Sequence, residues 1–432
     1  MLRKVSRRIR EASFTLLEGA TYSNRFAEYM GSLGERLDDG VGPFQPENLT
    51  IHAVPQSGLQ VPVLSTTILH LGTCRLRNLR LHGMGLHWEP SFLKNLSLTS
   101  LSITRIPIGW VRPTVIQVIR VLESLPDLQS LCLDSIDSSS NIPDSVVHLD
   151  HLSHLELDCT PTDWSLLLSH LVYPPLMVMR LASADTSTPK LDVLAGLSSV
   201  AQLRGQTLTT KLPIRCITVS RFSSGSVMLR TWNKRGTRSG PPSLDPTLQL
   251  EISLKSWRTD RSVHKLLIRI CGKLALGSLE GLHLEGVLVE AAPLLETFGK
   301  LKSLDTIRFV RLGLRGHSVV EALSAGIVRD TGEKAMTQVV SDCRLKFAAL
   351  RNLVCEYWIN KKEMKRSWQG LANCLKERRR RGAGIQTLFL RSSRLSCREI
   401  QSLKSKGVAQ ETCMSEVTVI SRKPRRRNPT RR

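Results

Sequence analysis

The segment Val111–Leu133 reads V-R-P-T-V-I-Q-V-I-R-V-L-E-S-L-P-D-L-Q-S-L-C-L and carries the repeating unit of the chain. Its first half predicts an amphipathic helix, because apolar residues recur on one face at helical spacing: Val115, Ile116, Val118, Ile119 and Leu122. Pro113 suits the first turn of this helix, and Pro126 ends it. The second half, Leu128-x-x-Leu131-x-Leu133, has the pattern of a leucine-rich-repeat strand. One such unit cannot bury its apolar side alone, so further copies are expected.

The strand pattern L-x-x-L-x-L recurs along most of the chain. Copies start at residues 76, 98, 128, 152 and 176, at steps of 22, 30, 24 and 24 residues. These steps fit the leucine-rich-repeat period of roughly 20–29 residues. Further copies start at 214, 279, 304, 350 and 385, and residues 248–254 alternate like a strand. The pattern predicts an α/β fold, a curved solenoid of irregular leucine-rich repeats with a strand and a helix per repeat. A plain helical bundle is the alternative.

The organisation along the chain follows from where the pattern is clear. Residues 1–60 are predicted to be a partial or irregular N-terminal repeat region, and residues 61–420 the solenoid. Residues 221–247 are rich in Ser, Gly, Pro and Arg, which predicts an exposed loop insertion. Residues 421–432 contain two prolines and no hydrophobic residue, so this basic tail is expected to be disordered.

The arginine run Arg378–Arg381, followed by Gly382, has two interpretations. The one we favour places the cations at the negative end of a helix, with Gly382 as its C-cap. The other is a phosphate-binding or nuclear-import patch. Beyond this run, the spacing Ser396-x-x-Glu399 predicts a last helix, and Val417–Val419 a closing strand.

Composition and charge limit the class of protein. The chain has 432 residues, is 41% hydrophobic and carries a formal net charge of +24. Removing the seven cations of residues 421–432 still leaves +17, so the basic surface favours acidic partners or nucleic acid. The most apolar stretch, Trp164–Leu181, is interrupted by polar residues and prolines, so no membrane partner is expected. Ten scattered cysteines and no visible signal peptide indicate a reducing compartment, cytoplasmic or nuclear.

Signatures of catalysis and of metal binding are missing from the sequence. It contains no G-x-S-x-G, Walker loop, G-x-G-x-x-G or H-E-x-x-H motif. His148, His151 and His154 are spaced by three residues, but the segment leads into a strand, where the three side chains spread apart. We therefore predict a protein that is not an enzyme and that uses no cofactor and no metal.

Candidate binding residues lie between the repeat leucines. Leucines of L-x-x-L-x-L point into the core, so the residues between them should face the concave side, which repeat proteins commonly use for binding. The candidates for contact with a target protein are Asn78, Arg80, His82, Asp134, His154, Glu156, Asp158, Arg180, His283, Glu285, Arg308 and Arg391. The candidates for nuclear import or nucleic-acid contact are Arg422, Lys423, Arg425, Arg426 and Arg427.

Two stretches resemble the leucine-rich-repeat region of fungal F-box proteins. They are P-T-V-I-Q-V-I-R-V-L-E-S-L-P-D-L-Q-S-L-C-L-D-S-I at 113–136 and L-A-N-C-L-K-E-R-R-R-R-G-A-G-I-Q-T-L-F-L-R-S-S-R-L-S-C-R-E-I-Q-S-L-K at 371–404. The resemblance implies a non-catalytic protein-binding scaffold, the substrate-recruiting part of an F-box-like ubiquitin-ligase receptor. No F-box motif of the form L-P-x-E is found here, so a Skp-type adaptor is expected only if an F-box lies upstream. The alternative is a basic nuclear scaffold that contacts nucleic acid through its Arg-rich tail.

Overall fold

A computed structural model supplies the structure of this chain. The residues that it describes are 11–16, 46–53, 75–89, 93–94, 96–106, 112–137, 145–174, 178–183, 213–221, 226–235, 248–254, 268, 271–272, 274–287, 290–311, 316–325, 345–356, 361–391 and 409–415. The chain divides into two compact units. Unit 1 comprises residues 1–212 with 249–256, and unit 2 comprises residues 213–248 with 257–432. Each unit has a mixed α/β fold built on an open sheet.

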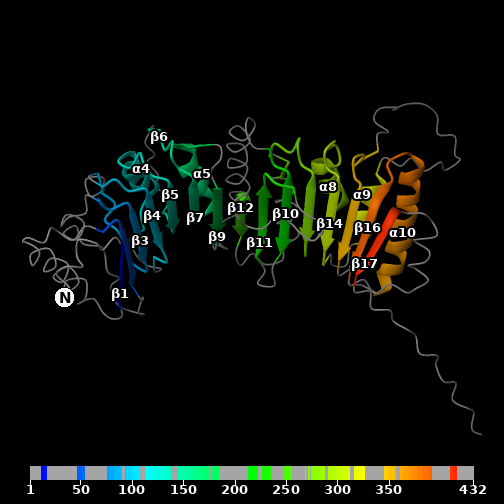
Figure 1. The fold of residues 1–432 in the computed structure, drawn as a ribbon, viewed down its shortest axis with the longest axis horizontal. Helices are drawn as coiled ribbons and strands as arrows, with labels where there is room; N and C mark the ends of the chain where they lie inside the picture. The colour runs from blue at the N-terminus through cyan, green and yellow to red at the C-terminus, as the bar shows by residue number, and fades with distance from the viewer. Residues whose placement is uncertain are drawn as a thin grey trace, which may run out of the picture. The chain divides into compact units, whose positions relative to one another are not determined.

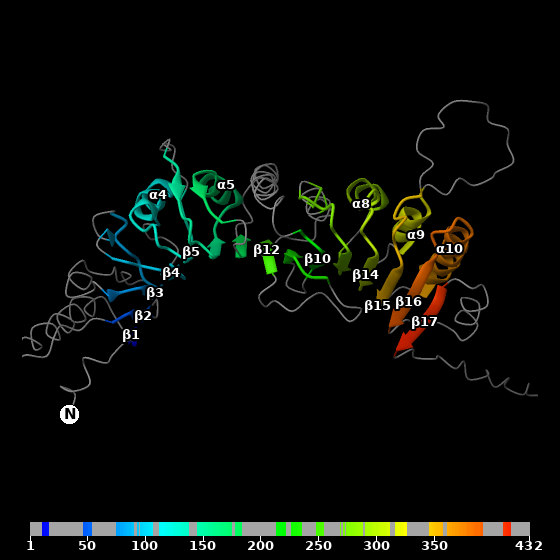
Figure 2. The same ribbon diagram turned by 45° about the horizontal axis from the view of Figure 1, so that its top comes forward.

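The sheet of unit 1 is parallel throughout. Its strands, in spatial order, are β1 (Glu11–Leu16), β2 (Asn48–Ala53), β3 (Asn78–His82), β4 (Ser100–Thr104), β5 (Ser130–Asp134), β7 (His154–Asp158), β9 (Val178–Ser183) and β12 (Leu248–Leu254) (Figure 1). The short strands β6 (Val147–His148) and β8 (Leu171–Val172) form a second parallel pair. Helices α4 (Val115–Glu123) and α5 (Pro161–Ser169) lie on one side of the large sheet, as Figure 2 shows.

Helix α4 begins with a capping box. The side chain of Thr114 accepts the N–H of Gln117 at 3.3 Å, and the Gln117 side chain accepts the N–H of Thr114 at 2.9 Å. Pro113 therefore lies before the cap, so the prediction of Pro113 in the first turn was wrong. The buried face consists of Val115, Val118, Ile119, Val121 and Leu122. Val121 replaces the expected Ile116, which is half-buried.

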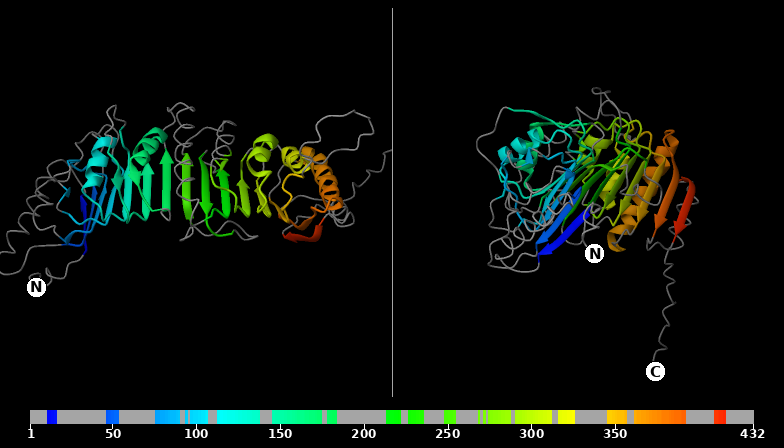
Figure 3. Two further views of the ribbon diagram at one scale, coloured as in Figure 1. Left: turned by 90° about the horizontal axis from the view of Figure 1, so that it is seen from above. Right: turned by 60° about the vertical axis from the view of Figure 1, so that its left-hand side comes forward.

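Unit 2 also has a mostly parallel sheet, with one antiparallel hairpin. Its strands, in spatial order, are β11 (Val227–Trp232), β10 (Cys216–Arg221), β13 (Gly281–Glu285), β14 (Thr306–Val310), β15 (Asn352–Glu356), β16 (Ile385–Arg391) and β17 (Ala409–Ser415). Figure 3 gives two further views of these neighbours. Helices α8 (Ala291–Phe298), α9 (Gly316–Ser324) and α10 (Lys361–Arg380) lie along one side of the strands (Figure 2).

The ten predicted copies of L-x-x-L-x-L are confirmed as strands of the two sheets. They correspond to β3, β4, β5, β7 and β9 of unit 1 and to β10, β13, β14, β15 and β16 of unit 2. The alternating residues 248–254 are β12. The prediction of a loop at 221–247 was wrong in part, because residues 227–232 form β11, which pairs with β10. Val227, Leu229 and Trp232 of this strand are buried. The expected helix near Ser396 and strand at Val417–Val419 lie outside the described residues.

A pair of hydrogen bonds repeats at the start of the strands. One carbonyl oxygen accepts two consecutive N–H groups of the next repeat, as Arg77 does from Thr99 at 2.7 Å and Ser100 at 2.9 Å. The carbonyls that act in this way are those of Glu47, Arg77, Thr99, Gln129, Arg215, Glu280, Asp305 and Arg351. Because each repeat satisfies backbone donors of its neighbour, register is fixed at this edge in both units.

A left-handed residue directly follows five of the strands. These residues have positive φ: Gly83 (72°), Arg105 (56°), Ser135 (67°), Gly286 (63°) and Arg311 (52°). In four of them the N–H donates to a main-chain carbonyl of the next strand, and in Arg105 it donates to the Asp134 side chain at 2.8 Å. The left-handed turn thus ends each of these strands and links it to its neighbour, a repeat feature that our sequence reasoning missed.

Gly382 and Arg378, the first residue of the arginine run at the end of α10, both serve the fold. Gly382 has φ +78°, its N–H donates to Arg379, and the N–H of Ala383 donates to Arg378. This is the Schellman arrangement, so the predicted C-cap is confirmed. Arg378 is fully buried and donates to the carbonyls of Leu323 at 3.2 Å, Lys346 at 2.8 Å and Phe347 at 2.6 Å. Arg378 therefore holds the end of α9 and a turn against α10, and is not part of an exposed phosphate-binding patch.

Candidate interaction surface

Each large sheet has two unlike faces. The repeat leucines point toward the described helices and are buried, such as Leu131 and Leu133 in β5. The residues between them point to the opposite side, which we call the polar face. In unit 1 it consists of Asn78, Arg80, His82, Ser100, Ser102, Thr104, Ser130, Cys132, Asp134, His154, Glu156, Asp158, Val178, Arg180 and Ala182. All of these side chains are half-buried or exposed.

Small hydroxyl side chains occupy the middle of the polar face of unit 1. Ser102 of β4 lies between Arg80 of β3 and Cys132 of β5 in the strand register. Burial, followed by the nearby Glu156 carboxylate, raises the pKa of the Cys132 thiol to about 11. Cys132 is therefore a neutral thiol at physiological pH and an unreactive part of the surface.

Carboxylates gather on the neighbouring strands β5 and β7. Asp134 accepts the main-chain N–H of Arg105 and, through its other oxygen, the hydroxyl of Ser135 at 2.8 Å. Glu156 lies 3.8 Å from Arg180, with both side chains more than a third exposed. Burial and the Arg180 charge lower the pKa of His154, so this histidine is neutral beside Glu156 near pH 7.

Two histidines lie side by side at the ends of β2 and β3. The ring centroids of His52 and His82 are 5.2 Å apart, and His82 Nδ1 is 2.9 Å from Thr104 Oγ1. Partial burial and the positive charge of Arg105 lower the pKa of His82. His82 is thus neutral near pH 7 at this corner of the polar face.

The polar face of unit 2 is built differently, because most of its members are buried. It consists of Thr218, Ser220, His283, Glu285, Thr306, Arg308, Val310, Asn352, Val354, Glu356, Thr387, Phe389 and Arg391. His283 is 3% exposed and Arg308 is 8% exposed. We expected both on an open surface, and that expectation was wrong. In the strand register, Val354 lies beside Arg308 and Val310 lies beside Glu356.

An ion pair with spare donors lies within this buried row. Arg308 Nη2 is 3.0 Å from Glu356 Oε1, and both side chains are nearly inaccessible. Arg308 Nε and Nη1 have no hydrogen-bond partner, and neither has Thr218 Oγ1. Both ring nitrogens of His283 also lack a partner. Burial, with the nearby Arg308 charge, lowers the pKa of His283 to about 3, so its ring is neutral.

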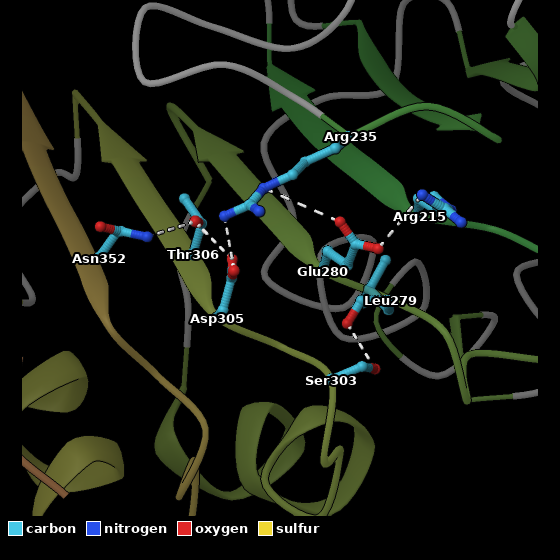
Figure 4. A network of polar contacts seen from close by, with 8 residues as sticks. All are labelled: Arg215, Arg235, Leu279, Glu280, Ser303, Asp305, Thr306 and Asn352. Carbon is cyan, nitrogen blue, oxygen red and sulfur yellow. Dashed lines mark hydrogen bonds and ion pairs between the residues drawn. The ribbon is translucent and has the colours of Figure 1, made fainter.

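The edge where the strands of unit 2 begin carries a half-exposed polar network, drawn in Figure 4. Arg235 lies 2.5 Å from Asp305 and 3.8 Å from Glu280, and Arg215 lies 3.6 Å from Glu280. Thr306 donates its hydroxyl to Asp305 at 2.7 Å. The two carboxylates are thus shared among neighbouring repeats, and they hold the edge of the sheet together.

The predicted binding residues fall into three groups. The first group lies half-buried or exposed on the polar faces. In unit 2 it consists of Glu285 and Arg391, and in unit 1 of Asn78, Arg80, His82, Asp134, His154, Glu156, Asp158 and Arg180. His283 and Arg308 lie buried in the polar face of unit 2. The tail residues Arg422, Lys423, Arg425, Arg426 and Arg427 lie outside the described residues.

The described residues contain neither a metal-ligand cluster nor a membrane-spanning helix. Among the described residues, no three His, Cys, Asp or Glu side chains converge as metal ligands. His148 belongs to β6 and His154 to β7, with His151 in the turn between them. Within the same part of the chain, no helix is long and apolar enough to cross a membrane.

Neither a known protein-family model nor a curated protein sequence matches this chain.

Proposed function

We propose that the chain is a non-catalytic protein-binding scaffold, an irregular leucine-rich-repeat solenoid that holds a target protein on its polar face. The observation that carries the proposal is the polar face of unit 1. There, five adjacent parallel strands, β3, β4, β5, β7 and β9, present half-exposed polar side chains in register opposite the described helices. Exposed polar side chains held on rigid strands cost little ordering entropy when a partner binds.

The chemistry of this face suits a polar protein surface. It presents serine hydroxyls, neutral histidines, the carboxylates Asp134, Glu156 and Asp158, and the cation Arg180. The carboxylates of β5 and β7 lie beside the cation Arg180 of β9, so binding would depend on matched hydrogen bonds and charges more than on apolar area. Together with the resemblance to F-box proteins, this favours recruitment of a ubiquitylation substrate as the form that the binding takes.

The proposal is tested by blocking the face with bulk. The variant Ser102→Tyr/Cys132→Tyr places two large side chains at the middle of the polar face of unit 1, and Glu123→Tyr on the exposed end of α4 is the matched control. Tagged full-length chains would be purified from cells, and bound proteins measured by quantitative mass spectrometry. We expect partners of the wild type to fall at least about tenfold with the double variant, a loss of about 1.4 kcal/mol or more in binding, and to persist with the control.

Two outcomes would count against this proposal. Partners that bind the double variant as well as the wild type, with melting temperatures unchanged, would exclude the polar face of unit 1 as the binding surface. If no Skp-type adaptor co-purifies with the protein encoded by the full natural transcript, the ubiquitin-ligase form of the proposal is excluded. The more general proposal of a protein-binding scaffold would stand.

The net charge of +24 favours a second candidate, nucleic-acid binding through the tail. Deleting residues 422–432 should then abolish binding to a DNA or RNA duplex, and binding of the intact chain should fall steeply as salt rises. Binding that is indifferent to both changes would rule this function out.

A further inference from the structure

We propose that the edge at which the strands of unit 2 begin binds the phosphate backbone of duplex DNA. We call it the entry edge: it comprises the described residues just before β10, β13, β14, β15 and β16, and those that follow β11. The inference goes beyond the proposed protein-binding function, which uses the polar face of unit 1. It also differs from the tail candidate, because every residue that it invokes lies within the described part of unit 2.

The entry edge of unit 2 is one continuous line. The carbonyl of Arg215 accepts the N–H of Glu280 at 2.9 Å, that of Glu280 accepts from Asp305 at 3.1 Å, and that of Asp305 accepts from Arg351 at 2.8 Å. The Arg235 side chain joins this line through its contacts with Glu280 and Asp305 (Figure 4). Neighbouring strands lie about 4.8 Å apart, so the five strands from β10 to β16 span roughly 20 Å, the length of about six base pairs.

Cations outnumber acids along this line. Two arginines hold its two carboxylates, and Arg380 and Arg381 hold Glu377 in the adjoining last turn of α10. The acids of the entry edge are Glu280 and Asp305, and its cations are Arg215, Lys234, Arg235, Lys300, Lys302, Lys346, Arg351, Arg379, Arg380 and Arg381. Those that form no ion pair with any described residue are Lys234, Lys300, Lys302, Lys346 and Arg351. Lys346 is half-buried and the other four are exposed, so the excess positive charge faces water.

The corresponding edge of unit 1 carries no such excess. Besides histidines, its described charged residues are the cations Arg75, Arg77 and Lys94 and the acids Glu47, Asp127 and Asp150. The two signs therefore balance there. The positive entry edge is a property of unit 2 and does not follow simply from the net charge of +24.

The composition of the entry edge favours DNA over an acidic protein. Protein–protein interfaces are enriched in aromatic residues and depleted in lysine, whereas protein–DNA interfaces are polar and strongly positive. Single-stranded nucleic acids are held by exposed aromatic rings on which bases stack. Aromatic side chains near this edge, such as Trp232 and Phe347, are buried. What remains exposed is charge, which suits sequence-independent contact with the phosphates of a duplex.

The first test measures binding of the full-length chain to a fluorescent DNA duplex by anisotropy over a range of salt concentrations. Lys300→Gln/Lys302→Gln removes two cations of the entry edge, and Arg75→Gln/Arg77→Gln makes the same change of charge at the corresponding edge of unit 1. Both variants keep the tail, so its contribution is common to them. We expect binding at low salt to weaken at least about fivefold in the lysine variant, and the slope of log affinity against log salt to fall in magnitude by about two. The arginine variant should change neither quantity.

The charge-preserving variant Lys300→Arg/Lys302→Arg should bind DNA like the wild type, which separates loss of charge from loss of fold. The proposal is overturned if the wild type does not bind the duplex, or if the two glutamine variants bind it equally well. A polyglutamate peptide that displaces DNA as well as unlabelled duplex of equal charge would overturn the choice of partner.

A second measurement locates the contact without any variant. The wild-type chain would be acetylated at its lysines with and without duplex DNA, and the rate at each lysine followed by mass spectrometry. Lys234, Lys300 and Lys302 should react at least about threefold more slowly with DNA present, and Lys94 of unit 1 should react at an unchanged rate. Protection of Lys94 equal to that of the three lysines, or no protection of them, would show that DNA does not bind at the entry edge of unit 2.

Discussion

The polar faces of the two units share one backbone plan and differ in how they treat charge. In unit 1, Glu156 and Arg180 lie in register on β7 and β9, 3.8 Å apart and more than a third exposed. In unit 2, Arg308 and Glu356 lie on β14 and β15 at 3.0 Å and are nearly inaccessible. Arg308 occupies the same position in its strand as Glu156, and Glu356 the same position as Asp158, yet the polar side chains are half-exposed in unit 1 and buried in unit 2.

The difference follows from the neighbours on each face. The long side chains of unit 1 stand among small ones, such as Ser102, Ser130 and Ala182, which leave them open to water. In unit 2 the register neighbours of Arg308 and Glu356 include Val354 and Val310. Exposure of a charged residue is thus set by the side chains on adjacent strands, which come from other repeats.

The largest contrast is expected when one member of each ion pair is removed. Arg308→Leu leaves Glu356 buried and unpaired, which should destabilise the chain by about 3–5 kcal/mol, whereas Arg180→Leu should cost less than about 1 kcal/mol. Urea denaturation followed by circular dichroism measures both. Arg308→Leu/Glu356→Leu should recover most of the loss, because no unpaired charge remains. Equal, small effects of Arg308→Leu and Arg180→Leu would show that the Arg308 pair is hydrated in solution.

The next largest contrast is expected in how the pH dependence of stability differs between His283 of unit 2 and His154 of unit 1. Burial lowers the pKa of His283 to about 3, below its unfolded value of 6.5, so the unfolded chain binds the extra proton between these values. Stability that is present above pH 6.5 should be lost as the pH falls toward 3, on the order of 4 kcal/mol in total. His283→Leu should remove this part of the pH dependence, measured as the urea midpoint from pH 7 to pH 4. His154→Leu in unit 1 should leave most of it, because His154 is only partly buried.

Leucine spacing was sufficient to predict ten of the strands, and the reason is local. Each L-x-x-L-x-L copy carries its own buried side, and stacking copies is the way to bury it. Strand β2 was missed because its segment shows only Leu49 and Ile51 of the pattern. Strand β11 was missed because Ser, Gly, Pro and Arg around it outweighed the alternation of Val227 and Leu229. In both cases the segment is a strand because it forms hydrogen bonds with a neighbouring strand, which the local sequence pattern does not reveal.

The candidate site could be predicted only in part. That His283 and Arg308 point away from the leucines follows from strand periodicity. Their burial does not, because it depends on residues of other strands and on register, which no local pattern contains. The left-handed residues after the strands could be predicted in two repeats, because Gly83 and Gly286 both directly follow a strand. At the equivalent position three other repeats have Arg105, Ser135 and Arg311, so glycine alone does not identify this position in the sequence.

These left-handed positions give the smallest and most local contrast. Gly286 of unit 2 has φ +63°, and a Cβ there would lie 3.2 Å from the carbonyl oxygen of Arg221. Gly286→Ala should therefore destabilise the chain by about 1–2 kcal/mol. Arg105 follows β4 in unit 1 at φ 56°, so Arg105→Gly relieves backbone strain and should be neutral or stabilising by up to about 1 kcal/mol. Thermal melting of both variants measures the pair. A loss of stability in Arg105→Gly that equals the loss in Gly286→Ala would mean that the arginine side chain, and not its φ angle, matters at this position, since glycine keeps the N–H that Asp134 accepts.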